Sequence, residues 1–541
     1  MFKENYLPNQ HCHLPLHSPK EPSGKRGTFS QVAYLPARCF NKPNFQSHFL
    51  IANNTPMPHR KFSSSLRLAV ALVTLCFNSL GCFHPLGIAL SAEPRKPNVL
   101  FIAVDDLNHW VGHLGRNKQT KTPNLDRLAK MGVTFTNAHC AAPICNPSRT
   151  ALLSGIRPST TGVYDNGDPY ELAVNNKQSL VTQFKDAGYE TLGMGKLWHG
   201  GLGFSKQWTS TGGPDGNGHG KPKVDDRSIG GIKFGIIDGD DTSVPDTHIA
   251  DYGIAELNKT HDEPFFLTVG FHKPHMPWNV PKKYYDMHPL DSIELPPTKP
   301  GDLDDLPAVA VRMAHSSGDH AAVLASGRWK EAVQAYLAAI SYLDGQVGRV
   351  LGALEKSPHA SNTIICLWGD HGWHLGEKEH WRKFALWEEA TRAPLIWVAP
   401  GVTKPNGVCN RTVDFMTIYP TLCELSGIPI PDHVVGKSIR SLLLDPNSAW
   451  SDVALTTFGQ NNHAVRDERW RYIRYADGSE ELYDHNNDTY EWTNLASKPE
   501  HNALKRQLAM KFPTINVPAV KEESAGNENQ KPKKNGGKKP K

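Results

Sequence analysis

The body of this sequence lacks an excess of positive charge. The chain of 541 residues carries a net charge of +5, but the basic residues gather at its two ends. Residues 1–92 hold nine Lys and Arg against two acidic residues, and residues 521–541 hold seven Lys against three Glu. The body between them is therefore acidic, which excludes a basic, phosphate-gripping protein as the default interpretation and argues against a nucleic-acid partner. With 39% hydrophobic and 21% charged residues, global disorder is excluded as well.

The chain also lacks an uninterrupted hydrophobic run long enough to span a bilayer. The apolar stretch 66–90 is broken by polar and helix-breaking residues, namely Asn78, Gly81, His84 and Pro85, so we expect no stable membrane span. A basic segment at 57–62 precedes this stretch, and small residues follow it up to Ala92. This order is typical of a secretory signal, and we predict export to the periplasm or the exterior.

Residues 1–56 show no apolar periodicity, so Met57 is the expected true start of the protein. A lipid anchor at Cys82 is an alternative fate for the exported chain, although Ser79–Gly81 before it fits such a motif loosely. At the other end, residues 519–541 are rich in Lys, Gly and Asn and predict a disordered tail.

Short apolar runs alternate with helical patterns through the body. The run 98–104 is continuously apolar and then breaks into Asp105 and Asp106, as a buried parallel strand does. Thr122 and Pro123 predict the N-cap and first turn of a helix that ends at Met131. Further strands are predicted at 191–194, 265–269, 363–368 and 395–398, and a long helix at 330–355.

This alternation predicts an α/β sheet with helices on both faces. In such sheets ligands bind beyond the carboxyl ends of the strands, so the polar residues that follow each strand should converge there. A hairpin is predicted from Trp470 to Tyr483 around an Asp477–Gly478 turn. We therefore expect a catalytic domain over 93–404 and a smaller subdomain over 405–518, between the extension 1–92 and the tail.

Two strand ends carry adjacent metal-binding side chains. Asp105 and Asp106 place two carboxylates side by side, and Asp370 and His371 follow the predicted strand 363–368. Like charges so close repel one another, and a hard cation such as Ca²⁺ or Mg²⁺ relieves that repulsion. A solvated loop is the alternative for either pair alone.

Cys145 stands just before an apolar, helix-like segment, where backbone N–H groups and the helix dipole favour an anion. A thiolate nucleophile is one interpretation, and a disulfide with Cys140 is another, reasonable in an exported chain. Neither explains the residues that follow, Pro147, Ser148 and Arg149.

These residues resemble the signature of the type I sulfatases. Cys145-x-Pro-Ser-Arg149 is followed by Leu-Ser-Gly155, where the family usually has Thr-Gly. Five further blocks occur in the family's order: Asp105–Asp106, Gly195-Lys196-x-x-His199, Lys273-Pro-His275-Met-Pro277, Asp370-His371-Gly372 and Trp381-Arg-Lys383. Segment 481–495 is similar to the closing hairpin of that family, and the likeness is strongest to the iduronate-2-sulfatases.

The resemblance implies an alkaline-phosphatase/sulfatase-like α/β sandwich, with a large mixed central sheet and a smaller C-terminal antiparallel sheet. It also implies that a formylglycine-generating enzyme oxidises Cys145 to formylglycine, whose hydrated aldehyde is the nucleophile. One Ca²⁺ ion would be bound by Asp105, Asp106, Asp370, His371 and the modified Cys145.

The remaining roles follow from the same resemblance. Arg149 would steady the hydrate, and Lys196 and Lys383 would clamp sulfate oxygens. His275 would protonate the departing sugar oxygen, and His199 would take the proton that accompanies sulfate expulsion. His272 and His374 are expected to support these residues or to face the substrate.

The expected substrate is a sulfated saccharide. Iduronate 2-sulfate of heparan or dermatan sulfate is the named expectation, with other sulfated glycans open. Side chains that could contact the sugar are Trp110, Tyr164, Asp165, Trp278 and Trp373, with core packing as the alternative for the aromatic ones. A phosphate or phosphonate ester hydrolase of similar fold is an alternative, although a single ligand cluster argues against a two-metal site. An inactive protein that binds sulfated glycans is a second alternative.

Overall fold

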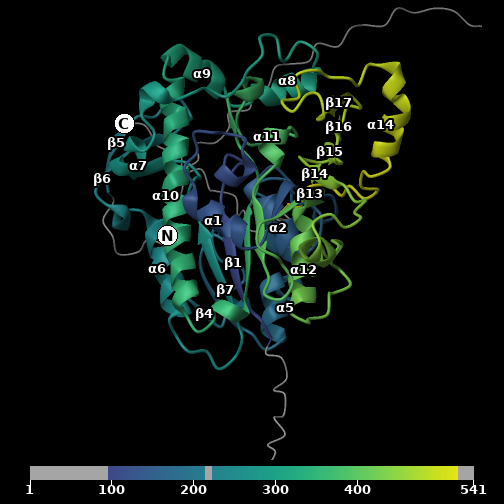
Figure 1. Ribbon diagram of the computed structural model, residues 1–541. Helices are drawn as coiled ribbons and strands as arrows, with labels where there is room; N and C mark the ends of the chain where they lie inside the picture. Colours follow the sequence, from purple (N-terminus) through teal and green to yellow (C-terminus); the bar gives the residue numbers. More distant parts are fainter. Residues whose placement is uncertain (1–95, 214–221, 522–541) are drawn as a thin grey trace, which may run out of the picture. The chain divides into compact units, whose positions relative to one another are not determined.

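A mixed sheet forms the centre of the protein (Figure 1). It has eight strands, in the order β13-β2-β12-β9-β1-β7-β3-β4. The computed structural model describes residues 96–213 and 222–521. The predicted signal segment, the start at Met57, Cys82 and the tail beyond residue 521 lie outside these residues. No helix in the described part of the chain is both long and apolar enough to cross a bilayer.

The predicted strands are confirmed and most are longer than expected. The parallel core of the sheet consists of β1 (Asn98–Val104), β7 (Phe265–Phe271), β9 (Thr363–Gly369) and β3 (Glu190–Gly195). β12 (Leu395–Val398) runs antiparallel to β9 and to β2 (Val133–His139), and this makes the sheet mixed. The edges are β13 (Gly407–Asp414), parallel to β2, and β4 (Ser210–Thr211).

Helices cover both faces because β1 is apolar on both sides. Leu100, Ile102 and Val104 pack in one cluster with α1 (Pro123–Met131), α6 (Pro245–Leu257) and the long α10 (Trp329–Lys356). Val99, Phe101 and Ala103 alternate with them and pack in a second cluster with α2 (Cys145–Ser154), α5 (Leu180–Asp186) and α12 (Ile418–Leu425). Side chains along a strand alternate between its faces, so one seven-residue strand supports two helical layers.

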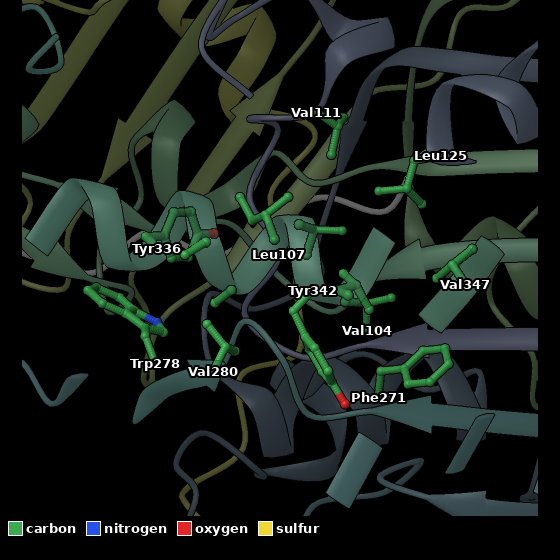
Figure 2. Packing of buried hydrophobic residues seen from close by; sticks show 14 of the residues in the cluster. Val104, Leu107, Val111, Leu125, Phe271, Trp278, Val280, Tyr336, Tyr342 and Val347 are labelled. Atoms are coloured by element: carbon green, nitrogen blue, oxygen red, sulfur yellow. The ribbon is translucent and has the colours of Figure 1, made fainter. Parts of the chain in front are cut away.

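The first of these clusters lies directly behind the strand ends. Figure 2 shows Tyr336 of α10 beside Leu107 and Trp278, with Val104 in the same layer. The rings of Trp278 and Tyr336 meet edge to face with centroids 5.3 Å apart. The loop that follows β1 therefore packs against α10 through Leu107.

The start of α1 differs from its prediction. Thr122 is the N-cap residue, but its side chain makes no cap hydrogen bond and instead accepts one from the Gly112 N–H at 2.8 Å. The N–H groups of Asn124 and Leu125, in the first turn, donate to Asp344 of α10 at 3.0 and 2.8 Å. A tertiary contact thus replaces the local cap that the sequence indicated.

A second sheet of four antiparallel strands lies in the C-terminal part: β14 (Ala454–Thr457), β15 (His463–Arg466), β16 (Trp470–Arg474) and β17 (Glu480–Asp484). The predicted hairpin is β16–β17, and Gly478 takes a φ of +85° in its turn. α14 (Asn502–Ala509) packs on this sheet through Leu508. β13 follows the predicted boundary near residue 405, yet it pairs with β2 in the large sheet. The predicted boundary therefore does not separate the large sheet from the four-stranded one.

A small third sheet was not predicted from the sequence. It joins β5 (Lys223–Asp226), β6 (Phe234–Asp238) and β8 (Trp278–Pro281). The remaining elements are α3 (Pro158–Thr161), α4 (Tyr170–Ala173), α7 (Lys282–Asp286), α8 (Ala308–Ala314), α9 (Asp319–Ser326), α11 (Glu388–Thr391), α13 (Arg440–Leu444), β10 (His374–Leu375) and β11 (Trp381–Arg382), with short 3-10 turns between them.

Candidate active site

The ends of four parallel strands bring the predicted site residues together. Asp105 and Asp106 follow β1, Lys196 follows β3, and Asp370 follows β9. Register fixes this convergence, since Val104 at the end of β1 pairs with both Phe271 and Gly369. The sequence expectation that the polar strand-end residues meet at one edge is confirmed.

The carboxylates form a compact, fully buried group. Asp105, Asp106 and Asp370 each have no exposed surface. The Asp106 N–H donates to Asp370 Oδ1 at 3.0 Å, and Asp106 takes a left-handed φ of +59° that turns the chain at this point. Burial opposes ionisation, but nearby cations outweigh it and lower the pKa of Asp105 and Asp106, whereas burial raises the pKa of Asp370.

Cys145 is the first residue of α2 and lies within this group. Its Sγ is 3.3 Å from His371 Nε2, and it accepts a hydrogen bond from Lys383 Nζ at 2.9 Å. Burial, together with the charge of Asp105, raises the pKa of the thiol. Cys140 and Cys145 are both free, so the disulfide interpretation is wrong, and the raised pKa disfavours a plain thiolate nucleophile.

Arg149 lies one helical turn after Cys145, on the same side of α2. Its guanidinium donates to Asp370 Oδ2 at 2.8 Å and to Asp105 Oδ1 at 3.2 Å. The remaining nitrogen donates to the Lys196 and Leu197 carbonyls at 2.6 and 2.9 Å. Within the described residues, the hydrogen bonds of the Arg149 guanidinium all go to carboxylates and backbone carbonyls. Arg149 therefore holds the carboxylates in place and forms no hydrogen bond with Cys145.

Two buried lysines stand over the carboxylates. Lys196 Nζ lies 2.6 Å from Asp105 Oδ2, and Lys383 Nζ lies 2.7 Å from Asp106 Oδ1. Burial disfavours their charge, yet Asp105 and Asp106 outweigh it and raise the pKa of both lysines. Both side chains are therefore protonated at neutral pH.

Two histidines border the group on its open side. His275 is 39% exposed, and its Nε2 lies 3.8 Å from Asp106 Oδ2. Its Nδ1 is 2.6 Å from the Met276 carbonyl, which assigns the proton to Nδ1 and leaves Nε2 facing the carboxylates. Desolvation lowers the pKa of His275 to about 4, and burial with the nearby Lys196 charge lowers that of His199 to about 4.

The donor set fits one hard cation. Ligand atoms of Asp105, Asp106, Cys145 and His371 all lie within 4.8 Å of one another. Asp106 Oδ2 is buried and has no hydrogen-bond partner, as expected of an oxygen reserved for an ion. His371 Nδ1 is held by the Gly372 carbonyl at 3.0 Å, so Nε2 points toward the carboxylates, and lies 3.5 Å from Asp370 Oδ1.

Comparisons with known proteins agree with this geometry. A family model described as Sulfatase matches residues 97–428, and one described as N-sulphoglucosamine sulphohydrolase, C-terminal, matches residues 376–517. The chain belongs to the sulfatase family. The family's reaction, hydrolysis of a sulfuric ester, is thereby the general activity of this protein.

Individual relatives place the chain within a broad family. It is 40% identical to a sulfatase of Formosa agariphila, covering 79% of this chain and 88% of that protein. It is 32% identical to human iduronate 2-sulfatase, covering 62% of this chain and 70% of that protein. Its fold is similar to the phosphonate monoester hydrolase of Agrobacterium radiobacter, with a TM-score of 0.66 and 22% identity over 77% of this chain and 94% of that one.

Three residues that support the site were missed by the sequence analysis. Tyr336 of α10 donates its hydroxyl to the Asp106 carbonyl at 2.8 Å and accepts from the Asn108 N–H at 3.0 Å. Ser148 Oγ donates to the Asp370 carbonyl at 2.5 Å. The third is Asp246 in the first turn of α6. Tyr336 lies in a helix whose pattern indicated only packing, Asp246 lies outside the predicted elements, and Ser148 was named only as part of the segment Cys145–Arg149. The sequence therefore carried no signal for their supporting role.

Asp246 supports the segment that carries His275. Its carboxylate accepts hydrogen bonds from the backbone N–H groups of His272 and Lys273, at 3.1 and 2.7 Å. His272 also approaches it through Nδ1 at 3.2 Å. His272 therefore has the supporting position expected of it, whereas His374 is buried elsewhere and bonds to the Glu377 carbonyl at 3.2 Å.

The aromatic residues expected to stack on a sugar are in the core. Trp278 and Trp373 have 0% and 1% exposure, Trp110 has 3% and Tyr164 has 6%. The burial of these rings favours the packing alternative over contact with substrate. Phe384 is partly exposed instead, and it takes a φ of +76°, unusual for a bulky residue, directly after Lys383.

Proposed function

We propose that this sulfatase removes a sulfate ester from a saccharide, with Cys145 oxidised to formylglycine as the reacting side chain. The observation that carries the proposal is the position of Cys145, buried at the first turn of α2 between Lys383 and His371. Since burial raises the pKa of its thiol, an unmodified Cys145 is a poor nucleophile at neutral pH. A formylglycine-generating enzyme is the maturation partner that this proposal requires.

A single Ca²⁺ would be bound by three carboxylates, His371 and residue 145, the carboxylates being Asp105, Asp106 and Asp370. When bound, the ion supplies positive charge that polarises a sulfate oxygen, and the oxidised residue 145 supplies an oxygen nucleophile. Arg149 holds two of the carboxylates in place through its guanidinium. Tyr336 and Ser148 fix the backbone on which those carboxylates stand.

Lys196 and Lys383 are proposed to bind the sulfate oxygens. Both are protonated, and each is in direct contact with one carboxylate of the group. Buried ammonium groups fixed before substrate arrives stabilise the charge that develops in the transition state without further reorganisation.

His275 is proposed to protonate the leaving sugar oxygen from Nε2. In the substrate-free enzyme its pKa is lowered to about 4, and the negative charge of a bound sulfate ester favours the protonated form. His199, whose pKa is also lowered to about 4, is neutral and able to accept the proton released at residue 145.

The substrate class that we propose is a 2-O-sulfated uronate, with iduronate 2-sulfate as the named candidate. Support comes from the 32% identity to human iduronate 2-sulfatase and from the shared Lys196-x-x-His199 spacing. Export of the mature protein remains part of the proposal, since extracellular glycans are its expected target.

Sulfate release from a panel of sulfated disaccharides tests the proposal. Each substrate is paired with its phosphate analogue, because the fold alone does not separate sulfatases from phosphonate hydrolases. We expect sulfate release to exceed phosphate release on every pair and to be greatest on 2-O-sulfated uronates. Preference for the phosphate analogues supports the hydrolase alternative, and binding without turnover supports the inactive glycan-binding alternative.

A further inference from the structure

A cavity of about 340 Å³ lies next to the site and is not used by the chemistry above. Ile144, the residue before Cys145, and Phe384, the residue after Lys383, both line it. Lys383 Nζ lies 5.9 Å from the centre of the Phe384 ring, so the cavity lies beside the group proposed to bind sulfate. It is the space into which the rest of a bound sulfate ester would extend.

The far wall of this cavity is α8, in residues 308–314. Val309, Arg312 and Met313 share one side of this helix and line the cavity. Ala310 and Ala314 are buried on the other side. The helix is therefore held in place by its small residues while it presents a mixed apolar and cationic surface inward.

Arg312 is the charged residue of α8 and stands among largely apolar neighbours. It is exposed, and it forms no hydrogen bond or ion pair within 4 Å to any residue in 96–213 or 222–521. The acidic residue whose pKa it lowers, Asp477, lies in the β16–β17 turn and is itself paired with Ser479. The guanidinium thus remains available to a ligand.

Aromatic and acidic groups complete the cavity. The rings of Phe384 and Phe458 line it, and a sugar ring packs its C–H face on such rings. Asp165 also lines it and is exposed, so its carboxylate can accept hydrogen bonds from sugar hydroxyls. The lining therefore combines a surface on which a sugar ring can pack, a carboxylate that accepts hydrogen bonds from hydroxyls, and a guanidinium that is unpaired within the described residues.

We propose that Arg312 binds a second anionic group of the saccharide, a carboxylate or a second sulfate, and so selects doubly charged substrates. This inference rests on the proposed function, since the first anionic group is the sulfate held by Lys196 and Lys383. A guanidinium matches the oxygens of either group through paired N–H donors. Arg312 would then be a specificity-determining residue contributed by a helix outside the recognised motifs.

The test measures kcat/KM for two matched substrate pairs on wild type, Arg312→Gln and Arg506→Gln. The first pair is a 2-O-sulfated uronate and its carboxyl-reduced counterpart, and the second is a disulfated sugar and its monosulfated counterpart. Arg506 is an exposed arginine on α14 that does not line the cavity, so its variant controls for loss of surface charge. Thermal unfolding of all three proteins checks that they are folded.

For each pair, the ratio compared is kcat/KM for the doubly charged substrate divided by kcat/KM for the singly charged one. We expect this ratio to fall about tenfold in Arg312→Gln, the size of one charge-assisted hydrogen bond at an exposed site. The ratio should be unchanged in Arg506→Gln. A fall on the uronate pair assigns a carboxylate as the ligand, and a fall on the disulfated pair assigns a sulfate. Unchanged ratios on both pairs overturn the inference while wild-type turnover still supports the proposed function. A wild type that releases no sulfate overturns both.

Discussion

The two halves of the site are built differently. The half that holds the carboxylates, Cys145 and Arg149 comes from strand ends and the first turns of a helix, and every one of these residues is fully buried. The half that we propose to face substrate comes from irregular segments and short helices, and its residues His275, Phe384 and Arg312 are partly or largely exposed.

This contrast separates the residues expected to carry out the reaction from those expected to determine which substrate binds. Parallel strands in register place their carboxyl ends with little freedom, and a buried network of charges around Asp105 and Asp370 leaves few alternative arrangements. Loops and α8 can change without disturbing that network. Substitutions in the first half should therefore abolish turnover, and those in the second half should change substrate preference.

The largest effect is expected from Cys145→Ala. Removing the side chain removes the reacting group, and kcat should fall roughly 10⁴-fold or more. Sulfate release and thermal unfolding measured together distinguish this loss from misfolding. Cys140→Ala is the matched control, a fully buried cysteine five residues earlier, and it should retain turnover. Equal losses in the two variants would contradict the assignment.

The next largest effect is expected from removal of the proposed Ca²⁺ ion. Treatment with a calcium chelator should lower kcat roughly 100-fold or more, because the lost charge stabilisation amounts to several kcal/mol. The melting temperature should fall as well, since a ligand that binds the folded state stabilises it. Added Ca²⁺ should restore both. Full activity in chelated protein that contains no metal by elemental analysis would refute the cation site.

A smaller loss is expected from Tyr336→Phe. The change leaves the Asp106 carbonyl and the Asn108 N–H without their partner, at about 1–3 kcal/mol of stability. It should also lower kcat about tenfold through displacement of Asp106.

Tyr342→Phe is the matched control for that variant. Tyr342 lies on the same helix, is buried, and shares a hydrogen bond with Thr247 Oγ1 at 2.8 Å. It should lose comparable stability and keep its kcat. If kcat falls equally in both variants, Tyr336 has only a packing role.

The smallest effect is expected from Phe384→Leu, which removes a ring from the cavity and keeps an apolar side chain. KM for a saccharide sulfate should rise about threefold, the loss of one weak stacking contact, with little change in kcat. Phe512→Leu removes a ring that packs on Tyr472 away from the cavity and should leave KM unchanged. A fall in kcat without a change in KM would place Phe384 among the reacting groups instead.

The sequence predicted the buried half of the site better than its exposed half. A continuous apolar run indicates a buried strand such as 98–104. The carboxylates directly after it could be placed at one edge of the sheet from the order of strands and helices alone. The positions of Lys196 and Lys383 came from resemblance to the sulfatases. Nothing local indicated that Asp344 caps α1, because that contact joins residues 220 positions apart.

The aromatic residues show why the exposed half of the site could not be predicted. Trp278 and Trp373 flank catalytic motifs in the sequence, yet both face the core, where their rings pack against Tyr336 of α10. Phe384 lines the cavity instead, and its backbone takes a left-handed conformation. Neither residue type nor spacing encodes that turn, and the part played by α8 depends on packing between distant segments.

Mass spectrometry of the tryptic peptide 131–149 tests the central claim most directly, because this peptide contains both Cys140 and Cys145. The protein is produced together with a formylglycine-generating enzyme, denatured, alkylated with iodoacetamide and digested. The account predicts one alkylated residue, Cys140, and a mass loss at position 145 that matches conversion of –CH₂SH to an aldehyde. Two alkylated cysteines in protein that actively releases sulfate would contradict it.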